Sequence, residues 1–181
     1  MLDKNSLFVM LFGVVILSGL LIFWWFEVFP DGNRSEEIST APQTRTFQTA
    51  QLGEQQLEVV LSETAREHQQ GLSRQPSIGS DGMLFVFSQP QQPVFWMNEM
   101  RFALDFIWIA NGRVVDLHEN VPYPEPHDSE IRTVQPSVPV DFVLEVPAGF
   151  IQRFGITMGT PFALTGKPVD KTWESSKLLQ E

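Results

Sequence analysis

The sequence predicts a mainly β domain with one or two short helices, arranged as a small barrel-like or sandwich sheet and preceded by an N-terminal transmembrane helix. Three observations support this prediction. Short apolar runs of strand length recur along the chain, turn-forming residues separate them, and one long uncharged apolar block stands near the N-terminus. With 181 residues, 43% of them hydrophobic, the chain is long enough for one domain with a compact core.

The apolar block from Leu7 to Phe26 contains no charged residue. In a helix it would span about 30 Å, the thickness of the hydrocarbon core of a bilayer. Its last residues, Phe23 to Phe26, carry bulky rings suited to a membrane interface, unlike the small residues of a cleavage site. We therefore expect residues 7–29 to be an uncleaved signal anchor. The flanking charges favour a cytoplasmic segment 1–6, so the domain is expected outside the cytoplasm at the cell membrane.

The net charge of −10 and the lack of cysteine exclude several classes of protein. Excess negative charge argues against binding to nucleic acid or to anionic lipid head groups. Without cysteine there is no disulfide framework, no thiolate metal site and no lipid-attachment cysteine. The predicted helix is therefore the anchor that we expect.

The segment after the block, residues 30–46, is rich in Ser, Thr, Glu and Pro and is expected to be a flexible tether. The β domain is expected over residues 47–165, and residues 166–181 are expected to form a mobile polar tail. Within the domain, residues 46–61 resemble two strands that turn at Gly53.

A short, mostly solvated helix is expected over residues 62–70. Thr64 and Glu67 have the spacing of a capping box, and Gly71 can provide the left-handed residue that ends many helices. His68 lies among Glu and Gln on this helix and is interpreted as a surface residue without a role.

The next strands are expected at residues 83–87 and 95–97, with a Gln- and Pro-rich loop over 88–93 between them. From Phe106 to Ile109 both alternating faces are apolar, which is typical of an interior strand. Asn111-Gly112 then predicts a tight hairpin and an amphipathic return strand.

The C-terminal part of the domain is predicted from its prolines and from its remaining apolar runs. Residues 121–139 contain too many prolines for a strand ladder and are expected to be an extended loop. A strand over 141–146, one or two helical turns ending at Gly155, and a closing strand over 160–164 complete the domain.

Several segments match one pattern in order. They are Gly71-Leu72 with Arg74, Gly82 to Phe87, Phe95-Trp96-Met97, Leu104-Asp105 with Ile107, Asn111-Gly112, and Val143 to Gly149. Together they resemble the bacterial and archaeal domain of unknown function 192 family, over about residues 57–164. The resemblance implies a small, mainly β domain outside the cytoplasm, and it implies no reaction and no catalytic residue. The chain departs from the family pattern at Asn98-Glu99-Met100, where Lys-Asn-Thr is usual, at Ala103 in place of Pro, and at Thr160 in place of Asp.

Two carboxylates interrupt apolar strands, Asp105 and Glu145, and an unpaired buried charge is costly. The first hypothesis pairs them with Arg74 and Arg101 in salt bridges that fix the register of the sheet. The second places these groups in a polar pocket that binds a ligand. The third uses the two carboxylates for acid and base catalysis.

Acidic and imidazole side chains also gather between residues 116 and 130, and could hold zinc, nickel or copper. His118, His127 and Asp128 are the candidates, but their spacing matches no tight metal motif. A solvated acidic loop is the simpler interpretation, and no metal or cofactor is predicted.

Aromatic and thioether side chains form the last set of candidates. Trp96, Trp108 and Tyr123 could stack on a sugar or a peptide, although buried tryptophans usually belong to the core. Met83, Met97 and Met100 faintly suggest a soft copper site, and gap filling is their ordinary role. The ligand-binding candidates are Arg74, Trp96, Met97, Arg101, Asp105 and Glu145.

The sequence thus favours a membrane-anchored extracytoplasmic β domain that is a non-catalytic binding or accessory module of the cell envelope. Its ligand is expected to be a small molecule, a glycan or a protein. The alternative is a small envelope hydrolase or transferase that uses Asp105, Glu145 and His118. No nucleophile elbow and no glycine-rich phosphate loop occurs in the sequence.

Overall fold

The computed structural model describes residues 43–125, 127 and 130–173. The expected cytoplasmic segment, the expected signal anchor and most of the expected tether lie outside these residues. Within the described part, no helix is long and apolar enough to cross a membrane.

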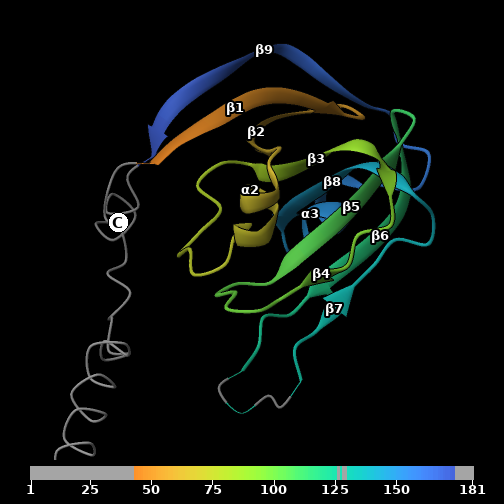
Figure 1. The fold of residues 1–181 in the computed structure, drawn as a ribbon. Helices are drawn as coiled ribbons and strands as arrows, with labels where there is room; N and C mark the ends of the chain where they lie inside the picture. Colours follow the sequence, from red (N-terminus) through yellow and green to blue (C-terminus); the bar gives the residue numbers. More distant parts are fainter. Residues whose placement is uncertain (1–42, 126, 128–129, 174–181) are drawn as a thin grey trace, which may run out of the picture. The chain divides into compact units, whose positions relative to one another are not determined.

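A seven-stranded sheet forms the body of the domain, in the order β6-β5-β8-β3-β2-β1-β9 (Figure 1). Its strands are β1 (Gln43–Leu52), β2 (Gln55–Ser62), β3 (Gly82–Gln91), β5 (Leu104–Ala110), β6 (Arg113–Val121), β8 (Val140–Pro147) and β9 (Phe162–Trp173). A two-stranded sheet pairs β4 (Phe95–Trp96) with β7 (Thr133–Val134). The helices of the described residues are the short α2 (Ala65–Gln70) and α3 (Phe150–Phe154). The mainly β class with short helices is confirmed.

The sheet is open, because β6 and β9 are its two edges and its strand order does not close on itself. The edges are nevertheless tied at one end. The Val114 N–H donates to the Thr160 carbonyl at 2.9 Å, and the Phe162 N–H donates to the Gly112 carbonyl at 2.8 Å. The sequence predicted a barrel-like or sandwich sheet. The structure instead has one open sheet whose edges are hydrogen-bonded to each other at one end.

The connection from β2 to β3 contains α2, and these two strands are parallel, as a crossover helix requires. The predicted capping box is confirmed. The Glu67 N–H donates to Thr64 Oγ1 at 3.2 Å, and the Thr64 N–H donates to Glu67 Oε2 at 2.8 Å. Gly71 ends the helix with a positive φ of 46°, although its ψ of −132° lies outside the expected left-handed helical region.

The expectation that His68 is a solvated surface residue was wrong. This side chain is half-buried, because its Nε2 lies 2.9 Å from the Ser62 carbonyl oxygen and its ring packs against Phe85 and Phe87. The sequence around His68 is polar, so it gave no sign of the two aromatic rings that strand β3 brings to the helix.

The hairpin of β5 and β6 is confirmed at the predicted turn. Asn111 and Gly112 both have positive φ, 52° and 69°, which fits a type I′ turn. Ala110 and Arg113 pair directly across the turn.

The main sheet carries a separate hydrophobic cluster on each face. Along β5, Phe106 and Trp108 belong to one cluster, whereas Ile107 and Ile109 belong to the other. We call these surfaces the Trp108 face and the Ile107 face. Helix α3 covers the Ile107 face through Ile151. Side chains from residues 72–78 and from residues 95–100 cover the Trp108 face. We call residues 95–100 the roof segment.

Three strands extend beyond their expected ends. β1 begins at Gln43, inside the expected tether, and β9 runs to Trp173, inside the expected mobile tail. β3 continues through Pro90 to Gln91, inside the expected loop. These stretches are polar and their order comes from backbone pairing, so the apolar pattern did not reveal them.

Candidate functional site

Asp105 is fully buried and points to the Ile107 face, since its neighbours Leu104 and Phe106 belong to the Trp108 face. Its Oδ1 accepts the Asn120 N–H at 2.7 Å, and its Oδ2 accepts the Ile151 N–H at 2.9 Å. Both carboxylate oxygens are therefore satisfied by backbone donors. The expected arginine partner of Asp105 was wrong.

The Asp105 carboxylate supplies the cap that helix α3 lacks. The N-cap residue of α3 is Gly149, which has no side chain to accept a hydrogen bond and adopts φ 86°. Ile151 is the second residue of the helix, so its N–H is one of the donors that a helix leaves unsatisfied. Asp105 accepts it from β5 and thereby fixes α3 against the sheet. This contact joins the Leu104-Asp105 motif to the helix that follows Gly149.

Glu145 lies on the opposite face. On β8 it alternates with Leu144 and Val146, which belong to the Ile107 face, so its side chain enters the Trp108 face. Its direct neighbours across the strands are Met83 on β3 and Phe106 on β5.

The carboxyl group of Glu145 is enclosed in an apolar environment. The residue is 5% exposed, and its Oε2 is buried without a hydrogen-bond partner. Desolvation raises the pKa of Glu145 to about 8, from an ordinary value of 4.5. The carboxyl is therefore mostly protonated at neutral pH. The guanidinium partner expected for Glu145 was also wrong.

The sheet itself separates the two acids. Phe106 pairs with Glu145 and Val146 pairs with Asp105, so the acids are diagonal neighbours that project to opposite faces. The two carboxyl groups therefore cannot reach the same substrate atom. The arrangement does not support the paired action that a two-carboxylate hydrolase needs.

The Phe95 ring of the roof segment packs onto the Trp108 face above β8. Its centroid lies 4.7 Å from that of Phe85 on β3, 5.6 Å from that of Trp108 and 5.7 Å from that of Phe106, both on β5. Strand β8 runs between β3 and β5, and Val143 pairs with both Phe85 and Trp108. The Phe95 ring therefore stands over Val143, beside the position of Glu145.

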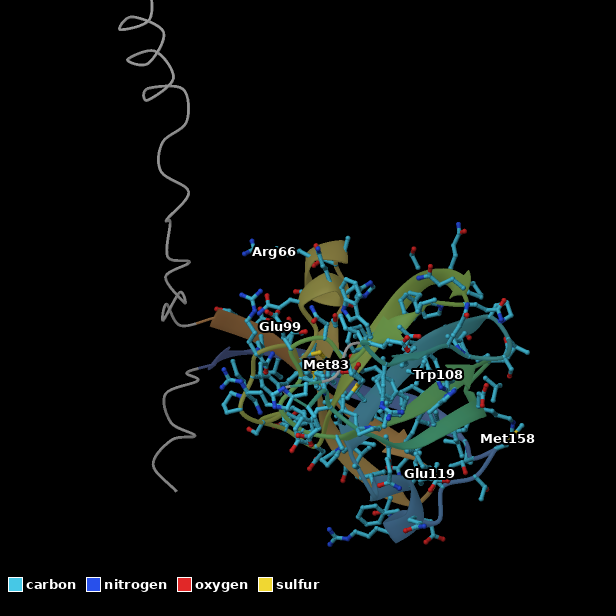
Figure 2. All side chains as sticks on the ribbon, turned by 90° about the horizontal axis from the view of Figure 1, so that it is seen from below. Arg66, Met83, Glu99, Trp108, Glu119 and Met158 are labelled. Atoms are coloured by element: carbon cyan, nitrogen blue, oxygen red, sulfur yellow. The ribbon has the colours of Figure 1, made fainter. Side chains whose placement is uncertain are left out.

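The rest of the roof segment alternates between the interior and the solvent. Trp96 is 55% exposed, whereas Met97 and Met100 are buried in the same cluster as Met83. Figure 2 shows Met83 and Trp108 among the interior side chains, and Met158 at the periphery. Of the sequence candidates, Met97 and Glu145 thus share the Trp108 face, and Trp96 projects away from it.

Hydrogen bonds hold the roof segment to neighbouring loops. The Met97 N–H donates to the Arg132 carbonyl at 2.9 Å, and Ser73 Oγ donates to the Asn98 carbonyl at 3.0 Å. The Arg74 N–H donates to the Glu99 carbonyl, and Arg74 Nε donates to Glu99 Oε2 at 2.8 Å. Arg74 therefore pairs with the roof segment and not with a buried acid.

Arg74 and Glu99 both have positive φ, 64° and 56°, which is uncommon for residues with a side chain. The ion pair between Arg74 and Glu99 therefore joins two loops whose backbone is conformationally restricted. Arg101 is exposed on the following loop. The candidate Arg74 thus contacts the roof segment, which contains the candidates Trp96 and Met97. Asp105 lies on the other side of the sheet.

His118 makes a specific contact within the Trp108 face. Trp108 Nε1–H, which can only donate, lies 2.8 Å from His118 Nδ1. The acceptor nitrogen must be unprotonated, so the neutral ring carries its proton on Nε2. His118 is therefore a partner of a buried tryptophan.

The proposed metal ligands do not gather in the described residues. His127 is exposed, and Asp128 lies outside the described residues. In the part of the chain that the structure describes, no three His, Asp or Glu side chains are placed to hold a metal ion. Asp116 is engaged by the Leu117 and Ser137 N–H groups at 2.8 Å each.

Three contacts were missed by sequence reasoning: Asp105 with α3, Trp108 with His118, and Met83 beside Glu145. Two of them join residues distant in the chain, whereas Trp108 and His118 are ten residues apart on the two strands of one hairpin. The alternation along β8 gave a signal, because it places Glu145 on the face opposite to Leu144 and Val146.

Comparison with known proteins identifies similar sequences and folds. A sequence model of the domain of unknown function 192 family, described as an uncharacterized ACR, matches residues 47–164. No curated protein matches the chain. A putative transcription regulator from Sinorhizobium meliloti 1021 has a similar crystal structure, with 27% identity, a TM-score of 0.55, and coverage of 68% of this chain and 95% of that one. A protein of unknown function from Novosphingobium aromaticivorans DSM 12444 shares the fold, with 24% identity, a TM-score of 0.54, and coverage of 74% and 99%.

Proposed function

This chain belongs to the domain of unknown function 192 family, and from that premise we propose that it is a membrane-anchored, non-catalytic ligand-binding module of the cell envelope. A single-pass signal anchor over residues 7–29 would hold the β domain outside the cytoplasm. The ligand would be a small molecule, a glycan or a protein of the envelope.

The anchored location is supported by the sequence. The block from Leu7 to Phe26 is uncharged, long enough to span a bilayer, and ends in aromatic residues. The described domain begins at Gln43, so a short segment would separate the bilayer from the sheet.

The binding role is supported chiefly by one observation, the enclosed Oε2 of Glu145 without a hydrogen-bond partner. A buried polar atom in a native protein normally has a partner, and a missing partner points to a bound water, ion or ligand. Glu145 points to the face of the sheet that the roof segment covers, and the roof segment contains the Phe95-Trp96-Met97 motif. Two motifs of the family thus meet on this face.

The other functional classes have weaker support. Asp105 is saturated by backbone donors and faces away from Glu145, so a two-carboxylate reaction has no shared site. The Sinorhizobium protein is described as a putative transcription regulator, but the net charge of −10 of this chain disfavours contact with DNA phosphates.

Cell fractionation and protease accessibility test the location. We expect full-length protein in the membrane fraction, and we expect external protease to digest the β domain in spheroplasts but not in intact inverted vesicles. A mature N-terminus near Asp31, or protection of the domain in spheroplasts, would rule out the anchored topology.

Native mass spectrometry tests the binding role. The full chain is purified from membranes in mild detergent, beside the variant Glu145→Gln and the matched surface variant Glu119→Gln. We expect a bound species on the wild-type protein and on the Glu119 variant that is lost from the Glu145 variant. Identical spectra for all three proteins would exclude a ligand held by Glu145.

A further inference from the structure

We propose that the thioethers of Met83, Met97 and Met100, with the carboxyl group of Glu145, form a binding site for a soft monovalent metal ion of the Cu⁺ class. This inference rests on the proposed binding function at Glu145 and extends it to a metal ion, beyond the small molecule, glycan or protein proposed above. It assigns no role to the histidines.

Met83 and Glu145 are held side by side by the sheet. They pair directly across β3 and β8, where the Cβ atoms of opposite residues lie about 4.5–5.5 Å apart. Both side chains enter the Trp108 face, and both residues are 5% exposed. A thioether sulfur and a carboxyl oxygen are therefore within reach of one small ion.

The path of the chain brings the roof segment over the same place. Phe95 stands over Val143 of β8, and the chain next joins the sheet at Leu104, which pairs with Pro147 of β8. The roof segment and the residues after it therefore cross the stretch of β8 between Val143 and Pro147. Within that stretch Glu145 is the residue that points to the roof segment.

Met97 and Met100 lie on this path and are buried beneath it. They are 1% and 7% exposed and belong to the same cluster as Met83. The Met100 N–H donates to the Met97 carbonyl at 3.3 Å, so a tight turn brings the backbones of the two residues close to each other. Two thioethers thus come from the roof segment and one from the sheet.

The donor set selects the kind of ion. Thioethers are soft ligands that favour Cu⁺ over Zn²⁺, Mg²⁺ or Ca²⁺. Glu145 would release its proton when the ion binds, and the resulting carboxylate would balance the single positive charge of the ion, which matters in a site shielded from water. The enclosed oxygen of Glu145 has no partner in the protein, so this arrangement would also supply one.

Gap filling is the competing explanation for the three methionines, and it makes a different prediction. If they only pack, replacement by leucine should cost less than about 1.5 kcal/mol of stability and should leave metal binding unaffected. If they are ligands, leucine should preserve the fold and weaken the metal affinity. A stable variant that has lost affinity therefore separates the two explanations.

The test uses Ag⁺ alone, a redox-stable probe of the same charge and softness, added to the full chain in detergent and chloride-free buffer. The ¹³C-labelled methionine methyl groups are followed by NMR, and the affinity is measured by calorimetry. We expect one equivalent of Ag⁺ to shift the methyl signals of Met83, Met97 and Met100. The exposed Met158 provides the internal control, because it is 69% exposed and far from the cluster in Figure 2.

The variants Met97→Leu and Met100→Leu should each weaken Ag⁺ binding by about tenfold or more, and Met158→Leu should leave it unchanged. Zn²⁺ should not shift the three signals. Equal shifts of Met158 and the cluster, or no shift at saturating Ag⁺, would overturn the metal assignment. If Ag⁺ fails but mass spectrometry still shows a species that depends on Glu145, only the metal assignment falls; if both fail, the proposed binding function falls with it.

Discussion

Glu145 should make the domain less stable as the pH rises, because its carboxyl takes up a proton when the chain folds. In the unfolded chain this carboxyl has an ordinary pKa of 4.5, whereas burial raises its pKa in the folded protein to about 8. Between these values the unfolded state is ionised and the folded state is protonated. The contribution of Glu145 to the free energy of unfolding is therefore highest below the lower pKa, falls through this interval, and ceases to change above it.

The size of the effect follows from the two pKa values. A pKa difference of one corresponds to about 1.36 kcal/mol, so the full loss between about pH 4.5 and pH 8 is at most about 5 kcal/mol. Water entry beneath the roof segment would relieve part of the penalty on the ionised carboxylate. Even half of this value would be a large share of the stability of an ordinary domain.

Denaturant unfolding in metal-free buffer at a series of pH values measures this loss. Glu145→Gln is the informative variant, because it keeps the shape and remains neutral. Its stability should change less with pH than that of the wild type, so the difference between the two proteins should widen toward high pH. Glu119→Gln, at an exposed position, controls for the charge change. Parallel curves for the wild type and the Glu145 variant would refute the reasoning.

Three further substitutions test the contacts described above, each by denaturant unfolding. Asp105→Ala leaves two backbone N–H groups without their acceptor and should cost about 3 kcal/mol; an unchanged midpoint would contradict its capping role. Gly82→Ala places a Cβ 2.7 Å from the Glu145 carbonyl oxygen and should cost about 1–3 kcal/mol, which a neutral result would disprove. His118→Ala leaves the Trp108 N–H without its acceptor and should lower the free energy of unfolding by about 1–3 kcal/mol. The control His127→Ala, at an exposed position, should have no effect.

Local patterns predicted the local features of the fold. The capping box of Thr64 and Glu67 and the turn at Asn111-Gly112 depend on residues a few positions apart, and both are present. The apolar alternation along β5 likewise predicted an interior strand. These features are encoded by backbone preferences and by periodicity, which a single sequence displays directly.

Long-range partners could not be predicted in the same way. The apolar residues on both sides of Asp105 showed that it needed a partner, but an arginine or two backbone N–H groups could equally satisfy that need. The choice depends on where α3 docks, 46 residues further along the chain. Polar strand ends such as those of β1 and β9 also escape prediction, because their order comes from each other and not from a buried face.

The pairing of β1 has a mechanical consequence. Among the described strands, residues 43–46 pair with β9 alone, and the second partner strand, β2, joins at Phe47, opposite Val60. A pull arriving from the N-terminal side would meet this single antiparallel ladder at its free end and open it one bond at a time. The buried Phe47 would halt that peeling, so tension would lengthen the link to an anchor before it disturbed the domain.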